Sequence, residues 1–140
     1  MRDVVIVDSV RTGLTKAFRG SFNLTRSDDL LAHCIDSLLD RNPQLGPDEV
    51  EDVYVGAASH AGEQDGNLAR LAVVLSKLPI TAAGVTINRF CSSGLQSIAL
   101  AANQIASGQT EVAIAGGVDS ISMRTRQEPG KAKQNHRPLD

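Results

Sequence analysis

The sequence predicts an α/β domain with a mostly parallel sheet and helices on both faces of that sheet. Short apolar runs rich in Val and Ile alternate with longer segments in which apolar residues recur at helical spacing. This alternation gives the order βαβαβαβ, which requires parallel strands joined by right-handed crossovers. Aromatic residues make up only 3% of the chain, so Val, Ile, Leu and Ala must build the core, as they do in buried parallel sheets.

The length and the charge of the chain limit the class of protein. With 140 residues, of which 41% are hydrophobic, the chain is large enough for one domain with its own core. Its 14 basic and 16 acidic residues are mixed along the sequence, so no basic face indicates nucleic-acid binding. No segment approaches the ~20 apolar residues that span a bilayer, and no signal-peptide pattern is present at the start. We therefore expect a cytoplasmic protein with no nucleic-acid or membrane partner.

The first part of the chain predicts a strand and then a helix. Residues 4–10, VVIVDSV, have the composition of a buried strand. After a polar connection, Ser27 is expected to be the N-cap of a helix, with Asp28 and Asp29 in the first turn, where the helix dipole favours negative charge. An apolar stripe at helical spacing follows, made of Leu30, Leu31, Cys34, Ile35, Leu38 and Leu39. Residues 42–43, Asn-Pro, are expected to end this helix.

A second strand and a second helix are expected next. The strand centres on residues 53–55 and is stopped by Gly56. A polar, glycine-containing loop follows, and Asn67 is expected to cap a helix over residues 68–78 that Pro79 terminates. Apolar residues lie nearly all round this helix, which predicts burial on more than one side and indicates contact with another subunit.

The remaining elements are a third strand, a long helix and a fourth strand. The third strand covers residues 84–90, and the helix runs from Cys91 to about Ser107, with Gly108 as its C-cap glycine. The fourth strand covers residues 111–117.

The predicted domain covers residues 1–122. Residues 123–140 are polar, have no hydrophobic period and contain two prolines and a glycine, so we expect the start of a polar loop region there. A parallel sheet that ends on such a segment is expected to be incomplete.

Cys91 occupies the junction between the third strand and the long helix. In an open α/β sheet, ligands bind beyond the carboxyl ends of the strands, so this junction lies at the functional edge. The N–H groups and the dipole of the helix N-terminus would stabilise a thiolate there, and the small residues Ser92, Ser93 and Gly94 leave room for a substrate. The pattern predicts a nucleophile for acyl transfer through a thioester, with backbone N–H groups as an oxyanion hole.

The other cysteine and the histidines have simpler interpretations. The alternative for Cys91 itself is a small buried hydrophobe, which is what most unpaired cysteines are. Cys34 lies on the apolar stripe of the first helix, so we expect it to be a core residue. His33, His60 and His136 have no ligand spacing relative to the cysteines, so no metal site is expected. His60 follows the second strand and reads as a solvated loop residue.

The segment NRFCSSGLQSIALAANQIASG, residues 88–108, resembles the active-site signature of the thiolases, which are acetyl-CoA acyltransferases. Further matches follow the chain in order: VVIVDSVRT at residues 4–12, AFRGSF at 17–22, GNLARLAVV at 66–74 and AIAGGVDSIS at 113–122. The similarity covers about residues 1–125, and the series is far more specific than an isolated Cys-Ser-Ser-Gly. It implies a thiolase-like N-terminal α/β domain that is truncated in this chain.

The resemblance implies that Cys91 takes an acyl group from a 3-ketoacyl-CoA or from acetyl-CoA, with its backbone N–H contributing to an oxyanion hole. Coenzyme A is then the co-substrate, and the family needs no metal or tightly bound cofactor. Residues 66–70 resemble a segment near the subunit interface of thiolases, which act as homo-oligomers, either dimers or tetramers. The AFRGSF segment favours the degradative 3-ketoacyl-CoA class.

The sequence departs from the family in what it lacks. Thiolases have a second, similarly folded half that supplies an activating histidine and a second cysteine. They also have an inserted region that grips coenzyme A, followed by the last strand of the first domain. None of these is present, so we expect the 140 residues alone to have negligible activity. Two alternatives stay open: a ketosynthase-type condensing enzyme, and a truncated thiolase-like chain with only a structural or subunit role.

Overall fold

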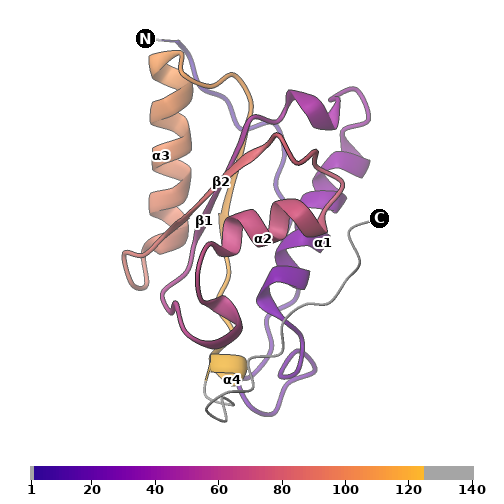
Figure 1. The fold of residues 1–140 in the computed structure, drawn as a ribbon, viewed down its shortest axis with the longest axis vertical. Coiled ribbons are helices and arrows are strands. Elements are labelled where there is room, and N and C mark those ends of the chain that lie inside the picture. The colour runs from indigo at the N-terminus through magenta and orange to yellow at the C-terminus, as the bar shows by residue number, and fades with distance from the viewer. Residues whose placement is uncertain (1, 125–140) are drawn as a thin grey trace.

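The structure, a computed structural model, describes residues 2–124 of the chain. Its elements in chain order are α1 (Ser27–Arg41), the 3-10 helix η1 (Pro47–Glu49), β1 (Asp52–Gly56), the 3-10 helix η2 (Gly62–Gln64), α2 (Leu68–Leu75), β2 (Ala83–Ile87), α3 (Ser93–Ser107), β3 (Ala113–Gly117) and α4 (Ile121–Arg124). Figure 1 shows the sheet between α3 on one side and α1 and α2 on the other. The predicted α/β class, with helices on both faces, is confirmed.

The sheet has three parallel strands in the order β2-β1-β3. Asp52 at the start of β1 pairs with Ala83 of β2 and with Ala113 of β3. The three carboxyl ends therefore meet at one edge of the sheet, at Gly56, Ile87 and Gly117. This is the edge at which an open α/β sheet carries its functional loops.

The core lies between β1, α1 and α2. Val53 and Val55 of β1 point into it and are 1% and 2% exposed. The two helices contribute Leu31, Ile35, Leu39, Leu68, Ala69, Ala72 and Val73. The predicted burial of the second helix on more than one side is confirmed, because α2 contacts both α1 and the sheet. Leu71, on its remaining face, is 40% exposed.

The predicted strand at residues 4–10 is wrong. The segment belongs to no strand of the described sheet, and its side chains Val5, Ile6 and Val7 are 75%, 81% and 77% exposed. A groove separates the residues that follow it from β3. Strand composition is a local property, whereas a strand forms only where a partner edge lies within hydrogen-bonding distance.

Polar contacts nevertheless hold this N-terminal segment against the domain. The N–H of Arg2 donates to the carbonyl of Ala106 at 3.1 Å. Further along, the Asp8 carboxylate accepts hydrogen bonds from Arg41 at 2.7 Å and from Asn42 at 3.0 Å. The segment is therefore tied to the ends of α3 and α1 without joining the sheet.

One of the two predicted helix N-caps is confirmed. Asn67 caps α2, and its Oδ1 accepts from the N–H of Arg70 at 3.2 Å. Ser27 is not the N-cap of α1, because the helix begins at Ser27 and its N-cap is Arg26. The Ser27 hydroxyl instead donates to Glu63, a residue of η2. A partner this far along the chain leaves no local pattern for a sequence-based prediction.

Two other helix boundaries differ by a few residues. α2 ends at Leu75, before Pro79 is reached. α3 begins at Ser93 rather than at Cys91, because the residues before it form a separate turn. Its end is as predicted, with Gly108 as the C-cap at φ +77°.

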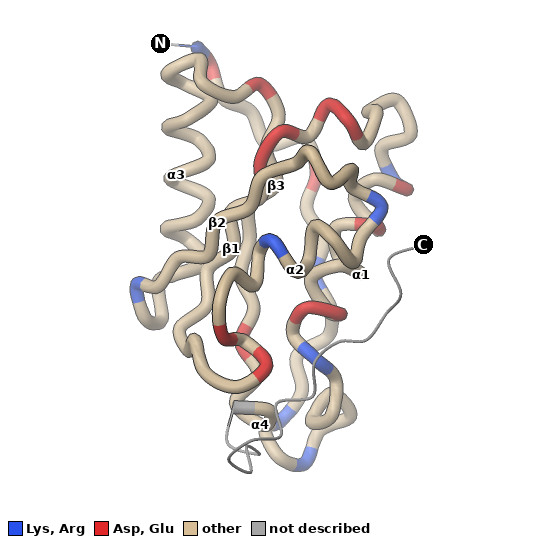
Figure 2. The backbone as a smooth tube through the Cα atoms, viewed as in Figure 1, with Lys and Arg blue, Asp and Glu red and all other residues tan. Residues whose placement is uncertain are grey.

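The described residues end in α4, which spans the predicted division between a domain at residues 1–122 and a polar loop region at 123–140. Residues 125–140 lie outside the described part of the chain. Within residues 2–124, no helix has both the length and the apolar character needed to cross a membrane. Figure 2 shows acidic and basic residues interspersed over loops and helix ends, with no continuous basic stripe on the part that is described.

Candidate active site

The turn from β2 to α3, residues 88–92, lies at the carboxyl edge of the sheet and carries Cys91. Cys91 is exposed and forms no disulfide. The alternative of a small buried hydrophobe is therefore wrong for this residue. The structure places the sulfur where the strand order predicts a ligand site, immediately before the N-terminus of a 15-residue helix.

The backbone of this turn is strained at Phe90. Its φ of +50° is left-handed, which costs a non-glycine residue roughly 1–2 kcal/mol. Ser93 supports the turn while only 3% exposed: its Oγ accepts from the N–H of Arg89 at 2.8 Å and donates to the carbonyl of Phe90 at 2.6 Å. Ser92 Oγ donates to the carbonyl of Arg89 at 3.0 Å. Cys91 therefore lies in a turn that is held by hydrogen bonds on both sides of it.

Glycines let the start of α3 pack directly on the strand ends. A Cβ on Gly56, the last residue of β1, would lie 2.2 Å from the carbonyl carbon of Ser93. A Cβ on Gly117, the last residue of β3, would lie 3.0 Å from Gly94 Cα. Deeper in the helix, Ser97 Oγ donates to the carbonyl of Gly116 at 2.6 Å. No side chain larger than hydrogen fits at positions 56 and 117 without moving the helix that follows Cys91.

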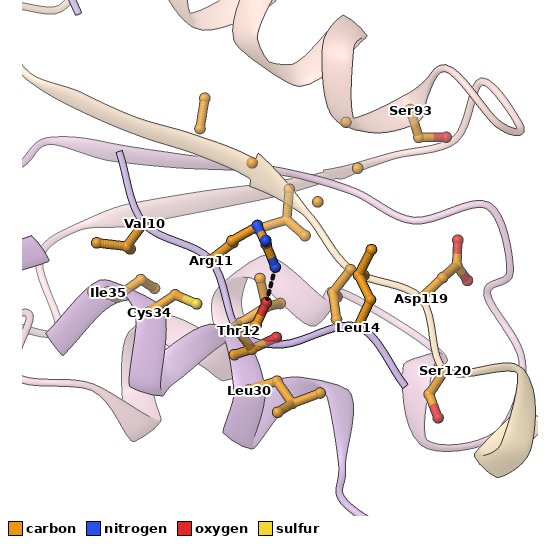
Figure 3. A pocket seen from close by; sticks show the side chains of 18 of the residues that line it. Val10, Arg11, Thr12, Leu14, Leu30, Cys34, Ile35, Ser93, Asp119 and Ser120 are labelled. Atoms are coloured by element: carbon orange, nitrogen blue, oxygen red, sulfur yellow. Dashed lines mark hydrogen bonds between the residues drawn. The ribbon is translucent and has the colours of Figure 1, made fainter. Parts of the chain in front are cut away.

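A groove of about 650 Å³ lies beside this turn, between β3, α1, the start of α3 and the N-terminal segment. Figure 3 shows α1 on one side of it and Ser93, at the start of α3, on the other. Most of its lining is apolar and comes from four parts of the chain: Val10, Leu14, Leu30, Leu38, Ile98 and Ile114. Arg11 also lines it, and its guanidinium donates to the carbonyl of Thr12 at 3.0 Å.

Cys34 lines this groove and is not a core residue, so the prediction that it belongs to the core is wrong. It is half-buried, whereas Leu31 and Ile35 on the same helix are 8% and 2% exposed. Burial raises the pKa of the Cys34 thiol, so this thiol is less ionised at neutral pH than a free cysteine. The apolar stripe of α1 serves two surfaces, since Leu31 and Ile35 belong to the core and also line the groove, whereas Cys34 lines the groove without being part of that core.

The histidines do not form a cluster in the described structure. His33 is exposed on α1. His60 is also exposed, with Nε2 3.1 Å from the carbonyl of Ala57 in the loop after β1, which agrees with the prediction of a loop residue. His136 lies outside the described residues. Between residues 2 and 124, no three His, Cys, Asp or Glu side chains are grouped so that they could hold a metal ion.

A buried glutamine that the sequence analysis missed links the loops of this edge. Gln64 is 0% exposed. Its Nε2 donates to the carbonyl of Ser59 at 2.6 Å and to Asp119 at 3.1 Å, while its Oε1 accepts from Ser27 at 2.9 Å and from the N–H of Ser120 at 2.6 Å. One side chain thus connects α1, the loop after β1 and the loop after β3.

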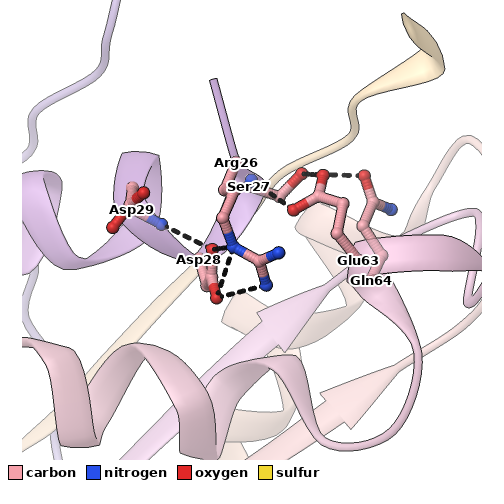
Figure 4. A network of polar contacts seen from close by, with 6 residues as sticks. All are labelled: Arg26, Ser27, Asp28, Asp29, Glu63 and Gln64. Atoms are coloured by element: carbon pink, nitrogen blue, oxygen red, sulfur yellow. Dashed lines mark hydrogen bonds and ion pairs between the residues drawn. The ribbon is translucent and has the colours of Figure 1, made fainter. Parts of the chain in front are cut away.

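Charged groups gather near this glutamine at the start of α1 (Figure 4). Asp28, whose side chain is 0% exposed, forms an ion pair with Arg26 at 2.9 Å. Glu63 accepts from the N–H of Ser27 at 2.8 Å and from its hydroxyl at 2.7 Å. Burial raises the pKa of Glu63, and the two hydrogen bonds from Ser27 oppose that effect. The carboxylate lies where the N-terminal dipole of α1 favours negative charge.

These features define an α/β protein with a candidate cysteine nucleophile on a strained turn at the carboxyl edge of a parallel sheet. Residues 4–138 match the family model described as "Thiolase, N-terminal domain". The match covers most of the chain, and the chain belongs to the thiolase family.

Individual relatives give the same result. The chain is 46% identical over 121 residues to a beta-ketoadipyl-CoA thiolase of Pseudomonas knackmussii, which covers 86% of this chain and 30% of that protein. It is 44% identical to the corresponding protein of Pseudomonas putida over 97% of this chain and 34% of the relative. A 3-ketoacyl-CoA thiolase of Vibrio vulnificus is 43% identical over 86% of this chain and 31% of its own length. The chain therefore spans about a third of the length of these relatives.

Proposed function

We propose that this chain is the N-terminal part of a thiolase-type acyltransferase in which Cys91 is the nucleophile. The proposal depends on one observation above all: Cys91 is exposed, on a strained turn, at the carboxyl edge of the sheet. The family match and the printed names of the relatives, which are CoA thiolases, supply the reaction class. Coenzyme A and its acyl thioesters are the substrates in this proposal, and no metal takes part.

The reaction proposed for the complete enzyme has two half-reactions. The Cys91 thiolate attacks the 3-keto carbon of a 3-ketoacyl-CoA, and the carbonyl electrons move onto oxygen. When the carbonyl re-forms, the bond between C2 and C3 breaks, and the departing carbanion takes a proton to become acetyl-CoA. The shortened acyl group stays on Cys91 as a thioester. The thiol of a second coenzyme A then attacks that thioester, loses its proton and releases the shortened acyl-CoA together with the Cys91 thiolate.

The local structure supplies the nucleophile and its surroundings. Cys91 lies in the turn immediately before α3, and N–H groups at a helix N-terminus can stabilise an oxyanion that forms nearby. The base for the thiol and the acid for the departing carbanion are assigned to the second half that the resemblance implies. General acid–base assistance contributes roughly 10²–10⁴-fold in rate, so the 140 residues alone are expected to turn over negligibly.

The assembly and location proposed are those of the resemblance. We assign the complete enzyme to the cytoplasm as a dimer or tetramer. Support for the oligomer comes from Leu71 on α2 and Val85 on β2, which are 40% and 39% exposed on neighbouring elements.

Acyl capture by the sulfur tests the function. The chain and its Cys34→Ser and Cys91→Ser variants are incubated with acetyl-CoA and digested, and the acetylated peptide is identified by mass spectrometry. Slow acetylation of Cys91 is expected in the parent and in Cys34→Ser, and none of it in Cys91→Ser. Acetylation confined to Cys34, or absent from both thiols, contradicts the proposal and favours a structural role.

A turnover assay tests whether the catalytic base and acid come from outside these 140 residues. The parent chain is mixed with acetoacetyl-CoA and coenzyme A, and consumption of the substrate is followed. No measurable CoA-dependent cleavage is expected, because the base and the acid are supplied from elsewhere. Robust cleavage would show that residues of this chain supply them and would contradict that part of the proposal.

A further inference from the structure

We propose that Asn88 is a positioning residue for the nucleophile, holding the turn that carries Cys91 through two main-chain hydrogen bonds. This inference rests on the proposed function of Cys91. Asn88 is the first residue after β2, and its side chain is exposed. Its amide therefore adds little to the packed core, and both of its bonds fall within the loops of the candidate active site.

The first bond supports the strained residue itself. Asn88 Oδ1 accepts from the N–H of Phe90 at 2.9 Å, which is an Asx turn, a local bond that stabilises a tight backbone bend. Phe90 is the residue with φ of +50°, directly before Cys91. A left-handed conformation of a bulky residue persists only where its surroundings fix it. Without this acceptor, Phe90 keeps only the hydrogen bonds that its carbonyl accepts from the hydroxyl and the N–H of Ser93, and its own N–H loses the Asn88 partner.

The second bond connects the turn sideways to the neighbouring strand. Asn88 Nδ2 donates to the carbonyl of Ala58, in the loop after β1, at 3.2 Å. The N–H of Ala58 in turn donates to Asp119 Oδ2 at 2.8 Å, and Asp119 accepts from the buried Gln64 at 3.1 Å. The loops after all three strands are thereby joined by an uninterrupted series of hydrogen bonds that ends at the turn of the nucleophile.

This arrangement gives Asn88 a role that bulk stability does not require. Its acceptor fixes the backbone that aims Cys91, and its donor fixes the distance between that backbone and the network around Gln64. Loss of both bonds lets Phe90 return to negative φ and changes the direction in which the turn holds the Cys91 side chain. The expected result is a less reactive thiol in a chain that still folds.

Cysteine alkylation measures this effect in the 140-residue chain. In a Cys34→Ser background, only Cys91 reacts with iodoacetamide, and its rate is measured across neutral and alkaline pH for Asn88→Ala, Asn88→Ser and the exposed helix control Asn103→Ala. A serine hydroxyl can still accept from the N–H two residues on but is too short to reach Ala58. Thermal unfolding of each variant is recorded alongside.

Asn88→Ala is expected to slow alkylation of Cys91 about fivefold near neutral pH, the equivalent of one ordinary hydrogen bond, and to move the rate profile to higher pH. Asn88→Ser is expected to restore most of the rate, and Asn103→Ala to match the parent. Equal rates for Asn88→Ala and Asn103→Ala would overturn the inference. A second result would also overturn the inference: both Asn88 variants lose rate in proportion to their lost thermal stability, and neither shifts the pH profile of alkylation.

The two proposals fail separately. Alkylation needs no acyl-CoA, so a parent chain that is not acetylated by acetyl-CoA contradicts the function while leaving the dependence of the thiol on Asn88 measurable. Conversely, if Cys91 is acetylated but its alkylation rate is the same in the Asn88 variants as in the parent, the function is supported and the positioning role is contradicted.

Discussion

Gln64 shows what a single buried side chain does for this fold. An amide has two donor hydrogens and two acceptor lone pairs, and all four have partners in Ser27, Ser59, Asp119 and Ser120, with the single hydroxyl hydrogen of Ser27 shared between Gln64 and Glu63. Because the side chain is fully buried, water cannot replace a partner that is lost. The amide thus fixes the start of α1 and the loops after β1 and β3 in one arrangement.

Gln64→Leu is expected to lower the free energy of unfolding by about 3 kcal/mol, because several buried polar groups lose their partner together. Gln44→Leu, at an exposed position before η1, is the matched control and is expected to change stability by less than about 0.5 kcal/mol. Urea unfolding of both variants measures the difference. Equal effects at the two positions would mean that the network contributes nothing to stability.

The position of Cys91 can be predicted from sequence, whereas the roles of Gln64 and Asn88 cannot. The position of Cys91 at the carboxyl edge follows from strand-helix alternation alone, since any residue at such a junction lies at that edge. Gln64 and Asn88 leave no such signal, because their partners come from loops that only the folded sheet brings together. A buried polar network is a property of tertiary structure, and the polar loop around Gln64 looks solvent-exposed in sequence.

At the scale of elements, the three long helices were predictable from sequence, whereas one predicted strand does not form. The spacing of Leu31, Ile35 and Leu39 identifies α1 because a helix carries its own hydrogen bonds. The apolar run at residues 4–10 has the composition of a strand but lacks an adjacent edge. Strands β1, β2 and β3 form close to their predicted positions because each has a paired neighbour, although β2 ends at Ile87 rather than at residue 90 and β3 begins at Ala113 rather than at residue 111.

Contact between α3 and the strand ends depends on glycine. Gly56→Ala is expected to lower the free energy of unfolding by about 1–3 kcal/mol, because the new Cβ would lie 2.2 Å from the backbone of Ser93 and would force α3 off the sheet. Gly116→Ala, in β3, is the matched control, since a Cβ there meets no atom within 4 Å. Thermal unfolding, with Cys91 alkylation as a second readout, distinguishes them. A Gly56 variant as stable as the Gly116 variant would contradict direct packing of α3 on β1.

At the scale of the whole molecule, the described chain exposes apolar surface that a soluble domain usually covers. Val5, Ile6 and Val7 lie consecutively in the N-terminal segment, and an apolar groove lies between the residues that follow them and β3. Contiguous apolar patches and open sheet edges promote association between molecules.

The chain is therefore expected to self-associate as its concentration rises, as measured by sedimentation velocity. Ile6→Lys is expected to shift the distribution toward monomer, because a charge in the patch opposes burial. Thr81→Lys, at an exposed position before β2, adds the same charge elsewhere and is the control. Identical distributions for the two lysine variants would mean that the N-terminal segment is not part of the associating surface.

The strand order also determines when each strand can pair while the chain is being synthesised. The central strand, β1, leaves the ribosome before both of its neighbours. Asp52 therefore cannot pair until Ala83 of β2, and later Ala113 of β3, have been synthesised. Every ladder in the sheet joins distant segments, and such pairing is slow because long loops must close first. Until β2 emerges, the nascent chain holds a strand with two bare edges, which makes that interval the one in which a chaperone has most to protect.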